Sequence, residues 1–197
     1  VELDAISDSL ENAVIATEDR TFYKNSGVNV KRFLLAIVSM GRFGGGSTIT
    51  QQLAKNAFLT QEQTVTRKAK EFFLSLELTK KYSKQEILTM YLNNAYFGNG
   101  VWGVEDASQK YFGTSAANLT VDEAATLAGM LKGPEIYNPI DNIQNATNRR
   151  NTVLANMVDD KKLSQADADS AAGVDMASRL DDTYQGTGDD YKYPSYF

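Results

Sequence analysis

Proline is absent from the first two thirds of this chain. The sequence has 3 prolines in 197 residues, and the first of them is Pro134. Since an interior proline breaks a helix, residues before Pro134 can form almost continuous helical structure. Apolar residues recur there at helical spacing, and 42% hydrophobic residues suffice for a core of ordinary size. The sequence therefore predicts a mainly α fold with few strands.

Helix-capping and helix-breaking residues between the apolar stretches define the expected helices. They lie at 4–17, at 29–42, after the Gly44-Gly-Gly46 break with Ser47 or Thr48 as cap, and at 64–81. Two capping boxes, Ser83-x-x-Glu86 and Thr120-x-x-Glu123, open further helices, and weaker ones are expected at 145–159 and 164–172. The end of the chain is rich in Asp, Gly and Tyr without periodicity, which is typical of a linker.

Two of these helices differ in how their apolar residues are distributed around the helix axis. At 64–81, an apolar stripe of Ala69, Phe72, Phe73 and Leu76 is expected to face the core, with Arg67 and Glu71 on the opposite side. The helix around 33–40 is apolar nearly all round and flanked by Lys31, Arg32 and Arg42. Such a helix is either buried in protein or in contact with lipid. Its apolar run is far shorter than the roughly 20 residues of a membrane span.

The residue types that are missing limit the chemistry. The chain has no Cys and no His, which excludes cysteine nucleophiles, Cys/His zinc sites and Ser-His-Asp triads. Acid–base work must therefore use carboxylates, Lys or Tyr. The Gly98-Asn-Gly100-Val-Trp-Gly103 stretch matches a dinucleotide-binding pattern, but it follows a predicted helix and not a strand, so we reject that function.

A basic block lies inside this acidic protein. Residues 24–84 carry a net charge of +8, although the whole chain has a net charge of −5. Lys55, Arg67, Lys68 and Lys70 crowd this block near two carboxylates, Glu18 and Glu71. The cations could clamp an anion beside two acid–base groups, or they could simply solvate helix faces, with Arg67 and Glu71 as an ordinary surface pair.

Four stretches in order resemble the motifs of the peptidoglycan glycosyltransferases, glycosyltransferase family 51. They are Glu18-Asp-Arg-Thr-Phe-Tyr-Lys-Asn-Ser-Gly27, Gly45-Gly-Ser-Thr-Ile-Thr-Gln-Gln-Leu-Ala-Lys-Asn56, Arg67-Lys-Ala-Lys-Glu71 and Lys84-Gln-Glu-Ile-Leu-Thr-Met-Tyr-Leu-Asn-Asn-Ala-Tyr-Phe-Gly98. A later stretch, Gly103 to Gly113, also fits. The final Tyr193-Pro-Ser-Tyr-Phe197 is similar to the start of the transpeptidase half of class A penicillin-binding proteins. We therefore expect a glycosyltransferase domain at 1–180 and a linker at 181–197.

The resemblance implies a lysozyme-like helical large lobe and a smaller hydrophobic lobe that faces the membrane. It implies polymerisation of lipid II into β-1,4-linked glycan strands, by an inverting displacement that releases undecaprenyl pyrophosphate. Glu18 is then the general base, Lys55 and Arg67 neutralise the pyrophosphate, and Glu71 assists the leaving group or orients the cations. The residues expected to line the donor site are Ser47, Gln51, Gln52, Asn56, Lys68 and Tyr96.

Partners and location follow from the same resemblance. We expect lipid II and the growing glycan strand, the membrane surface, moenomycin-type inhibitors and a transpeptidase domain in the same full-length chain, but no nucleic acid. The expected location is the extracytoplasmic face of the bacterial cell membrane. No cofactor is expected to be obligatory; Mg or Mn could stimulate the reaction, but the sequence shows no dedicated ligand set for a metal.

Two positions depart from the family pattern. Asn25 stands where the first motif often has His, which we expect to affect only a turn. Gln63 stands where many members have a basic residue, so Lys55 and Arg67 are expected to carry more of the pyrophosphate contact. Two other functions remain open from the residues alone: a lysozyme-like enzyme that cleaves glycan, and a non-catalytic scaffold on the membrane surface.

Overall fold

The chain folds into ten α-helices and three short 3-10 helices within the described residues. The computed structural model describes residues 1–38, 47–59 and 64–181. The α-helices are α1 (Asp8–Glu18), α2 (Val30–Val38), α3 (Ile49–Phe58), α4 (Val65–Lys81), α5 (Lys84–Asn94), α6 (Val104–Phe112), α7 (Val121–Met130), α8 (Pro134–Tyr137), α9 (Ile143–Asp159) and α10 (Gln165–Ala172). The 3-10 helices are η1 (Leu3–Ala5), η2 (Ala116–Asn118) and η3 (Met176–Arg179). The described ranges contain no strand, only one isolated bridge between Tyr96 and Trp102, so the mainly α prediction is confirmed.

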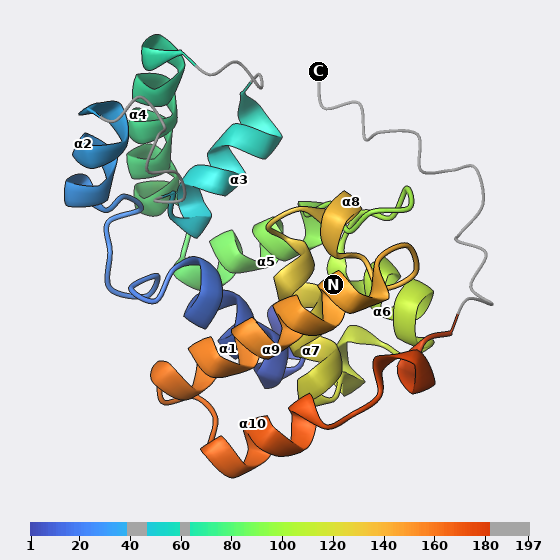
Figure 1. Ribbon diagram of the computed structural model, residues 1–197. Coiled ribbons are helices and arrows are strands. Elements are labelled where there is room, and N and C mark those ends of the chain that lie inside the picture. Colours follow the sequence, from blue (N-terminus) through green and yellow to red (C-terminus); the bar gives the residue numbers. More distant parts are fainter. Residues whose placement is uncertain (39–46, 60–63, 182–197) are drawn as a thin grey trace.

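The helices form two groups. In Figure 1, α2, α3 and α4 lie together at the upper left, a larger group of helices lies below, and α5 runs between the groups. The main apolar core belongs to the larger group and to the inner faces of α3 and α5, whereas α2 and α4 contribute no residue to it. A large helical lobe and a smaller lobe are therefore present, as the family resemblance implied.

The centre of the large lobe is α7. All its residues from Asp122 to Met130 are buried, and it packs against both α1 and α9. Small residues permit this close packing: a Cβ at Gly129 would come within 2.7 Å of Arg149 Cγ on α9. The capping boxes predicted at Ser83 and Thr120 are both present.

The predicted core face of α4 is wrong. The buried side chains are Arg67, Glu71, Ser75 and Leu78, whereas Phe73 of the expected apolar stripe is 66% exposed. Apolar spacing identified an apolar side of the helix, but that side does not face the main core: Phe72 contacts Phe33 of α2, and Phe73 is exposed. The polar side of α4 packs against α3 instead, and the reason is the set of charged contacts described below.

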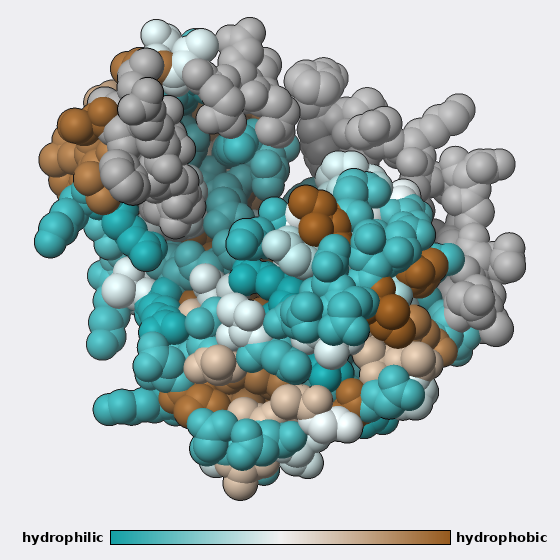
Figure 2. Space-filling view, viewed as in Figure 1, coloured by the Kyte–Doolittle hydropathy of each residue, from teal (hydrophilic) through white to brown (hydrophobic). Residues whose placement is uncertain are grey.

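The outer side of the small lobe is apolar. Val30, Leu34, Leu35 and Val38 of α2 are all more than half exposed, and apolar side chains gather over this part of the molecule in Figure 2. The ring of Phe33 faces inward and lies 4.5 Å from the ring of Phe72 on α4. The alternative that α2 is wholly buried in protein is therefore wrong. No helix in the described ranges is long and apolar enough to cross a membrane.

Two expectations lie outside the described residues. Met40, Arg42 and the Gly44–Gly46 break fall in 39–46, and Gln63 falls in 60–63. Nearly all of the expected linker, 182–197, is also outside, so the boundary at residue 180 stays a prediction.

Candidate active site

Glu18 is the last residue of α1, and the turn after it is fixed to α3. The side chain of the next residue, Asp19, is only 5% exposed. Its carboxylate accepts hydrogen bonds from Asn25 Nδ2 at 3.1 Å and from the backbone N–H of Ile49 at 3.2 Å. Ile49 is the first residue of α3, where free N–H groups favour a negative charge. This contact places the Glu18 carboxylate beside the start of α3.

Asn25 does more than shape a turn, which corrects the sequence expectation. Its Oδ1 accepts from the Gly27 N–H and from Lys84 Nζ, both at 2.9 Å, while its Nδ2 holds Asp19. Burial lowers the pKa of Lys84, and the nearby Asp19 charge partly opposes that shift. Asn25 thus joins the Glu18 turn to the start of α5.

Gln52 is the direct partner of Glu18. Its Nε2 donates to Glu18 Oε2 at 3.1 Å and to the Ser47 carbonyl at 3.4 Å. Its Oε1 accepts from the hydroxyl of Tyr91 on α5 at 2.9 Å. Burial, with a contribution from the Glu18 charge, raises the pKa of Tyr91 well above its ordinary value. The hydroxyl therefore stays protonated, and its bond fixes the Gln52 amide with the N–H side toward Glu18.

The second carboxylate, Glu71, is reached through Ser47 and Lys68. Lys68 Nζ donates to Ser47 Oγ at 3.0 Å and to Glu71 Oε1 at 2.9 Å. Glu71 is 4% exposed, so this charge is buried together with its partner. A continuous hydrogen-bonded line consequently runs from Glu18 through Gln52, Ser47 and Lys68 to Glu71. We call it the Glu18–Glu71 line.

Further cations flank this line. On α3, Lys55 and Asn56 follow Gln52 by three and four residues and therefore share its side of the helix. Lys55 is half-buried and Asn56 is exposed. Arg67 stands on α4 one residue before Lys68 and is 7% exposed. A base candidate at one end with a cluster of positive charges beside it can hold an anion near a proton acceptor.

Two predicted site residues lie elsewhere. Gln51 is 1% exposed, and its Oε1 accepts from the Thr48 N–H at 2.9 Å as part of the α3 capping box. Tyr96 follows the end of α5, and its hydroxyl donates to Glu135 Oε1 at 3.0 Å. The structure therefore gives Gln51 a role in holding the helix start and places Tyr96 in a different hydrogen-bonded group.

Sequence reasoning missed Tyr91 and Asp19. Tyr91 shares helical spacing with the buried residues Ile87, Leu88 and Leu92 of α5. A buried tyrosine hydroxyl needs a partner, which is the signal that would have pointed to a polar contact. Nothing in the pattern around Asp19 distinguishes it from a residue that solvates the end of α1.

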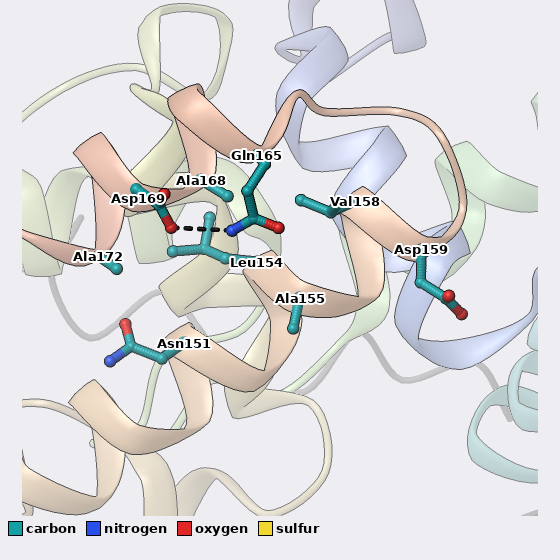
Figure 3. Close-up of a pocket in the computed structure, with 9 residues that line it drawn as sticks. All are labelled: Asn151, Leu154, Ala155, Val158, Asp159, Gln165, Ala168, Asp169 and Ala172. Atoms are coloured by element: carbon teal, nitrogen blue, oxygen red, sulfur yellow. Dashed lines mark hydrogen bonds between the residues drawn. The ribbon is translucent and has the colours of Figure 1, made fainter.

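A separate pocket of about 250 Å³ lies between α9 and α10 (Figure 3). Its lining residues carry no cation: Asn151, Leu154, Ala155, Val158, Asp159, Gln165, Ala168, Asp169 and Ala172. The volume is below that of typical ligand sites, and none of these residues belongs to the Glu18–Glu71 line. Within the described ranges no group of three or more Asp or Glu side chains could hold a metal ion.

Comparisons with known proteins identify the family of this chain. The family model described as Transglycosylase matches residues 1–158. The chain is 68% identical over 197 residues, its whole length, to penicillin-binding protein 2a of Streptococcus pneumoniae serotype 2, of which it covers 27%. It is 43% identical over 175 residues to penicillin-binding protein 1A of Vibrio cholerae, a match that covers 87% of this chain and 21% of that protein.

A solved structure shares the fold. The crystal structure of penicillin-binding protein 1A from Haemophilus influenzae superposes with a TM-score of 0.55 at 26% sequence identity, covering 89% of this chain and 17% of that one. The chain thus spans about a quarter of the length of the curated relatives it matches first.

Proposed function

Because this chain belongs to the transglycosylase family and is a peptidoglycan glycosyltransferase, we propose that it polymerises lipid II. The products are β-1,4-linked glycan and undecaprenyl pyrophosphate. The observation that carries the proposal is the Glu18–Glu71 line, which has the Glu18 carboxylate at one end and the Lys68–Glu71 ion pair at the other, with the cations Lys55 and Arg67 on the same two helices. Configuration inverts in a single displacement, so no covalent enzyme intermediate is needed.

Glu18 is the general base in this reaction. The acceptor sugar's 4-hydroxyl gives its proton to Glu18 as its oxygen forms a bond to C1 of the donor sugar. The Gln52 amide occupies Oε2, and we assign the proton to Oε1. Since Tyr91 fixes the Gln52 amide, the carboxylate is held in one orientation before the acceptor arrives, which lowers the reorganisation that the transition state requires.

The cations receive the leaving group. As the bond from C1 to the pyrophosphate oxygen breaks, its electron pair stays with the pyrophosphate, and Lys55 and Arg67 neutralise the growing charge. Lys68 stands beside them with Glu71 as its partner. We assign Glu71 the orientation of Lys68, and Ser47, Gln52 and Asn56 the polar wall of the donor site.

The apolar side of α2 suits a lipid surface. Its four exposed aliphatic side chains are accompanied by Lys31 and Arg32, which are exposed on the same helix. Aliphatic groups enter the acyl boundary while Lys and Arg contact anionic headgroups. We propose that this side of the small lobe rests on the extracytoplasmic face of the bacterial membrane, where the lipid chain of the substrate resides.

The wider setting belongs to the same proposal. The relatives are bacterial penicillin-binding proteins much longer than this chain, which supports a transpeptidase domain in the same full-length protein. Binding of moenomycin-type inhibitors and stimulation by Mg or Mn are further expectations. Cleavage of glycan is the weaker alternative, because hydrolysis of a soluble strand requires neither the cation cluster nor the exposed apolar side of α2.

The test is polymerisation of lipid II by the purified chain. We expect long glycan on gels, release of one undecaprenyl pyrophosphate for each glycosidic bond formed, and digestion of the product by a β-1,4-specific muramidase. Absence of polymer from folded protein in the presence of detergent or liposomes would refute the proposal. Cleavage of preformed glycan without synthesis would support the hydrolase instead.

A further inference from the structure

A stacked aromatic pair, the exposed Trp102 and the half-buried Tyr96, lies beyond the end of α5. The rings of Tyr96 and Trp102 are 4.7 Å apart and inclined at 42°, and the two residues form an isolated antiparallel bridge. Trp102 is 44% exposed. The Tyr96 hydroxyl donates to the exposed carboxylate of Glu135 and accepts from the Gly100 N–H at 3.3 Å. An accessible indole ring and an exposed carboxylate are therefore both in contact with Tyr96.

The turn before Trp102 uses left-handed backbone conformations. Gly98, Asn99, Gly100 and Gly103 all have positive φ angles, and Asn99 is not a glycine. Asn99 is held by hydrogen bonds from its Nδ2 to the Tyr111 hydroxyl at 3.0 Å and to Asn138 Oδ1 at 3.3 Å. Glycine adopts this conformation freely and Asn tolerates it better than most residues, and the two hydrogen bonds hold the turn to α6 and to the end of α8. The turn fixes Trp102 against Tyr96.

We propose that Trp102, Tyr96 and Glu135 form a binding subsite for sugar rings of the glycan strand, outside the Glu18–Glu71 line. This inference rests on the proposed function, which supplies a glycan as substrate and product. One side of a pyranose ring presents C–H groups that stack on the electron-rich face of an aromatic ring, and its hydroxyls donate to a carboxylate. An aromatic pair beside Glu135 offers both contacts.

The local charge identifies which part of the substrate binds there. Glu135 and Asp141 both act electrostatically on the neighbouring Tyr111 and help to raise its pKa, after burial, to about 12. The negative charges of Glu135 and Asp141 repel pyrophosphate and anionic headgroups. A saccharide with hydroxyl and acetamido groups is therefore the favoured occupant.

The subsite lies close enough to the catalytic residues to hold the same strand. Tyr91 contacts Gln52 within the site, and Tyr96 follows it by five residues, the last two of which lie beyond the end of α5, so the two Cα atoms are at most about 18 Å apart. Figure 1 shows α8, which carries Glu135, beside the loop that follows α5. A short oligosaccharide can span this interval, so sugars adjacent to the reacting unit are the ones expected on Trp102.

The chain itself supplies the reporter for a test. Trp102 is its single tryptophan, so a titration with a soluble, uncharged tetrasaccharide of β-1,4-linked N-acetylglucosamine can be followed by its fluorescence. We expect a saturable change in emission for the wild type and an equal one for Glu18→Gln, since binding does not require catalysis. An emission spectrum that the tetrasaccharide leaves unchanged would overturn the proposal.

Variants give the second arm, with binding measured by calorimetry. Trp102→Ala should weaken tetrasaccharide binding by about threefold to tenfold, Trp102→Phe should retain part of it, and Glu135→Gln should weaken it without loss of the reporter. Tyr23→Ala, a change to an aromatic residue of similar exposure (48%), is the matched control. Equal affinity of the Trp102 and Glu135 variants and the wild type would refute the subsite. If the wild type binds the tetrasaccharide through Trp102 but polymerises no lipid II, the proposed function fails and the subsite stands.

Discussion

Replacement of Gln52 by Ala removes both hydrogen bonds of the series that runs from Tyr91 through Gln52 to the Glu18 carboxylate. The change removes the 3.1 Å bond to Glu18 Oε2. A hydrogen bond to a charged group contributes about 1.5–3 kcal/mol, so its full loss from the transition state lowers kcat/KM for polymerisation about 10–150-fold. The Tyr91 hydroxyl is also left buried without its acceptor, at a cost of about 1–3 kcal/mol in stability, or roughly 2–10 °C in Tm for a domain of this length.

Adding Tyr91→Phe to Gln52→Ala separates the loss of stability from the loss of activity. The double variant no longer buries an unsatisfied hydroxyl, so most of the lost Tm should return, while activity stays low because Glu18 still lacks Gln52. Thermal melting and lipid II turnover on the four members of the cycle measure both effects. Gln109→Ala, which removes a Gln–Glu contact of 3.3 Å on α6, is the matched control and should retain activity. Additive Tm changes, or activity that recovers together with stability, would refute the reasoning.

Three other outcomes are expected. Lys55→Ala and Arg67→Ala should each lower kcat/KM at least about tenfold by weakening pyrophosphate neutralisation; steady-state kinetics unchanged in both variants would place the anion elsewhere. Leu34→Ser with Val38→Ser should reduce sedimentation with anionic liposomes at constant Tm, and the reverse result would contradict membrane contact. Burial, and to a lesser extent Asp8, raises the pKa of Glu11 above its ordinary 4.5, so folded stability falls as pH rises through that region. Glu11→Gln should therefore raise Tm at pH 7, with the difference lost below about pH 4. A Tm equal to that of the wild type at both pH values would show that burial of this charge does not lower the stability of the fold.

Helix boundaries were readable from the sequence because their signals are local. The capping boxes at Ser83 and Thr120 begin α5 and α7 as predicted. The same signature occurs at Thr48-x-x-Gln51, where it begins α3. This signature predicts that the Gln51 side chain bonds to the backbone at the start of α3, so that its neighbour Gln52 is the residue left to contact Glu18.

The orientation of α4 could not be read from apolar spacing alone. That method assumes that the only apolar environment is the protein core. In this chain the buried side of α4 carries Arg67 and Glu71, because those charges are stabilised by the site, and Phe73 points away from the protein. A helix between a polar site and an apolar exterior reverses the usual pattern. The position of Tyr96 was equally inaccessible, since Trp102 reaches it through the glycine-rich turn and Glu135 reaches it from α8, 39 residues further along the chain.

The central claim is that Glu18 takes the proton from the acceptor hydroxyl. The most direct measurement is lipid II polymerisation by Glu18→Gln, which keeps the size of the side chain and removes its basicity, beside Glu11→Gln, which makes the same change on the same helix. We predict that Glu18→Gln forms no polymer while its circular dichroism spectrum stays native. Glu11→Gln should form polymer at the wild-type rate. Wild-type turnover by folded Glu18→Gln would contradict the central claim.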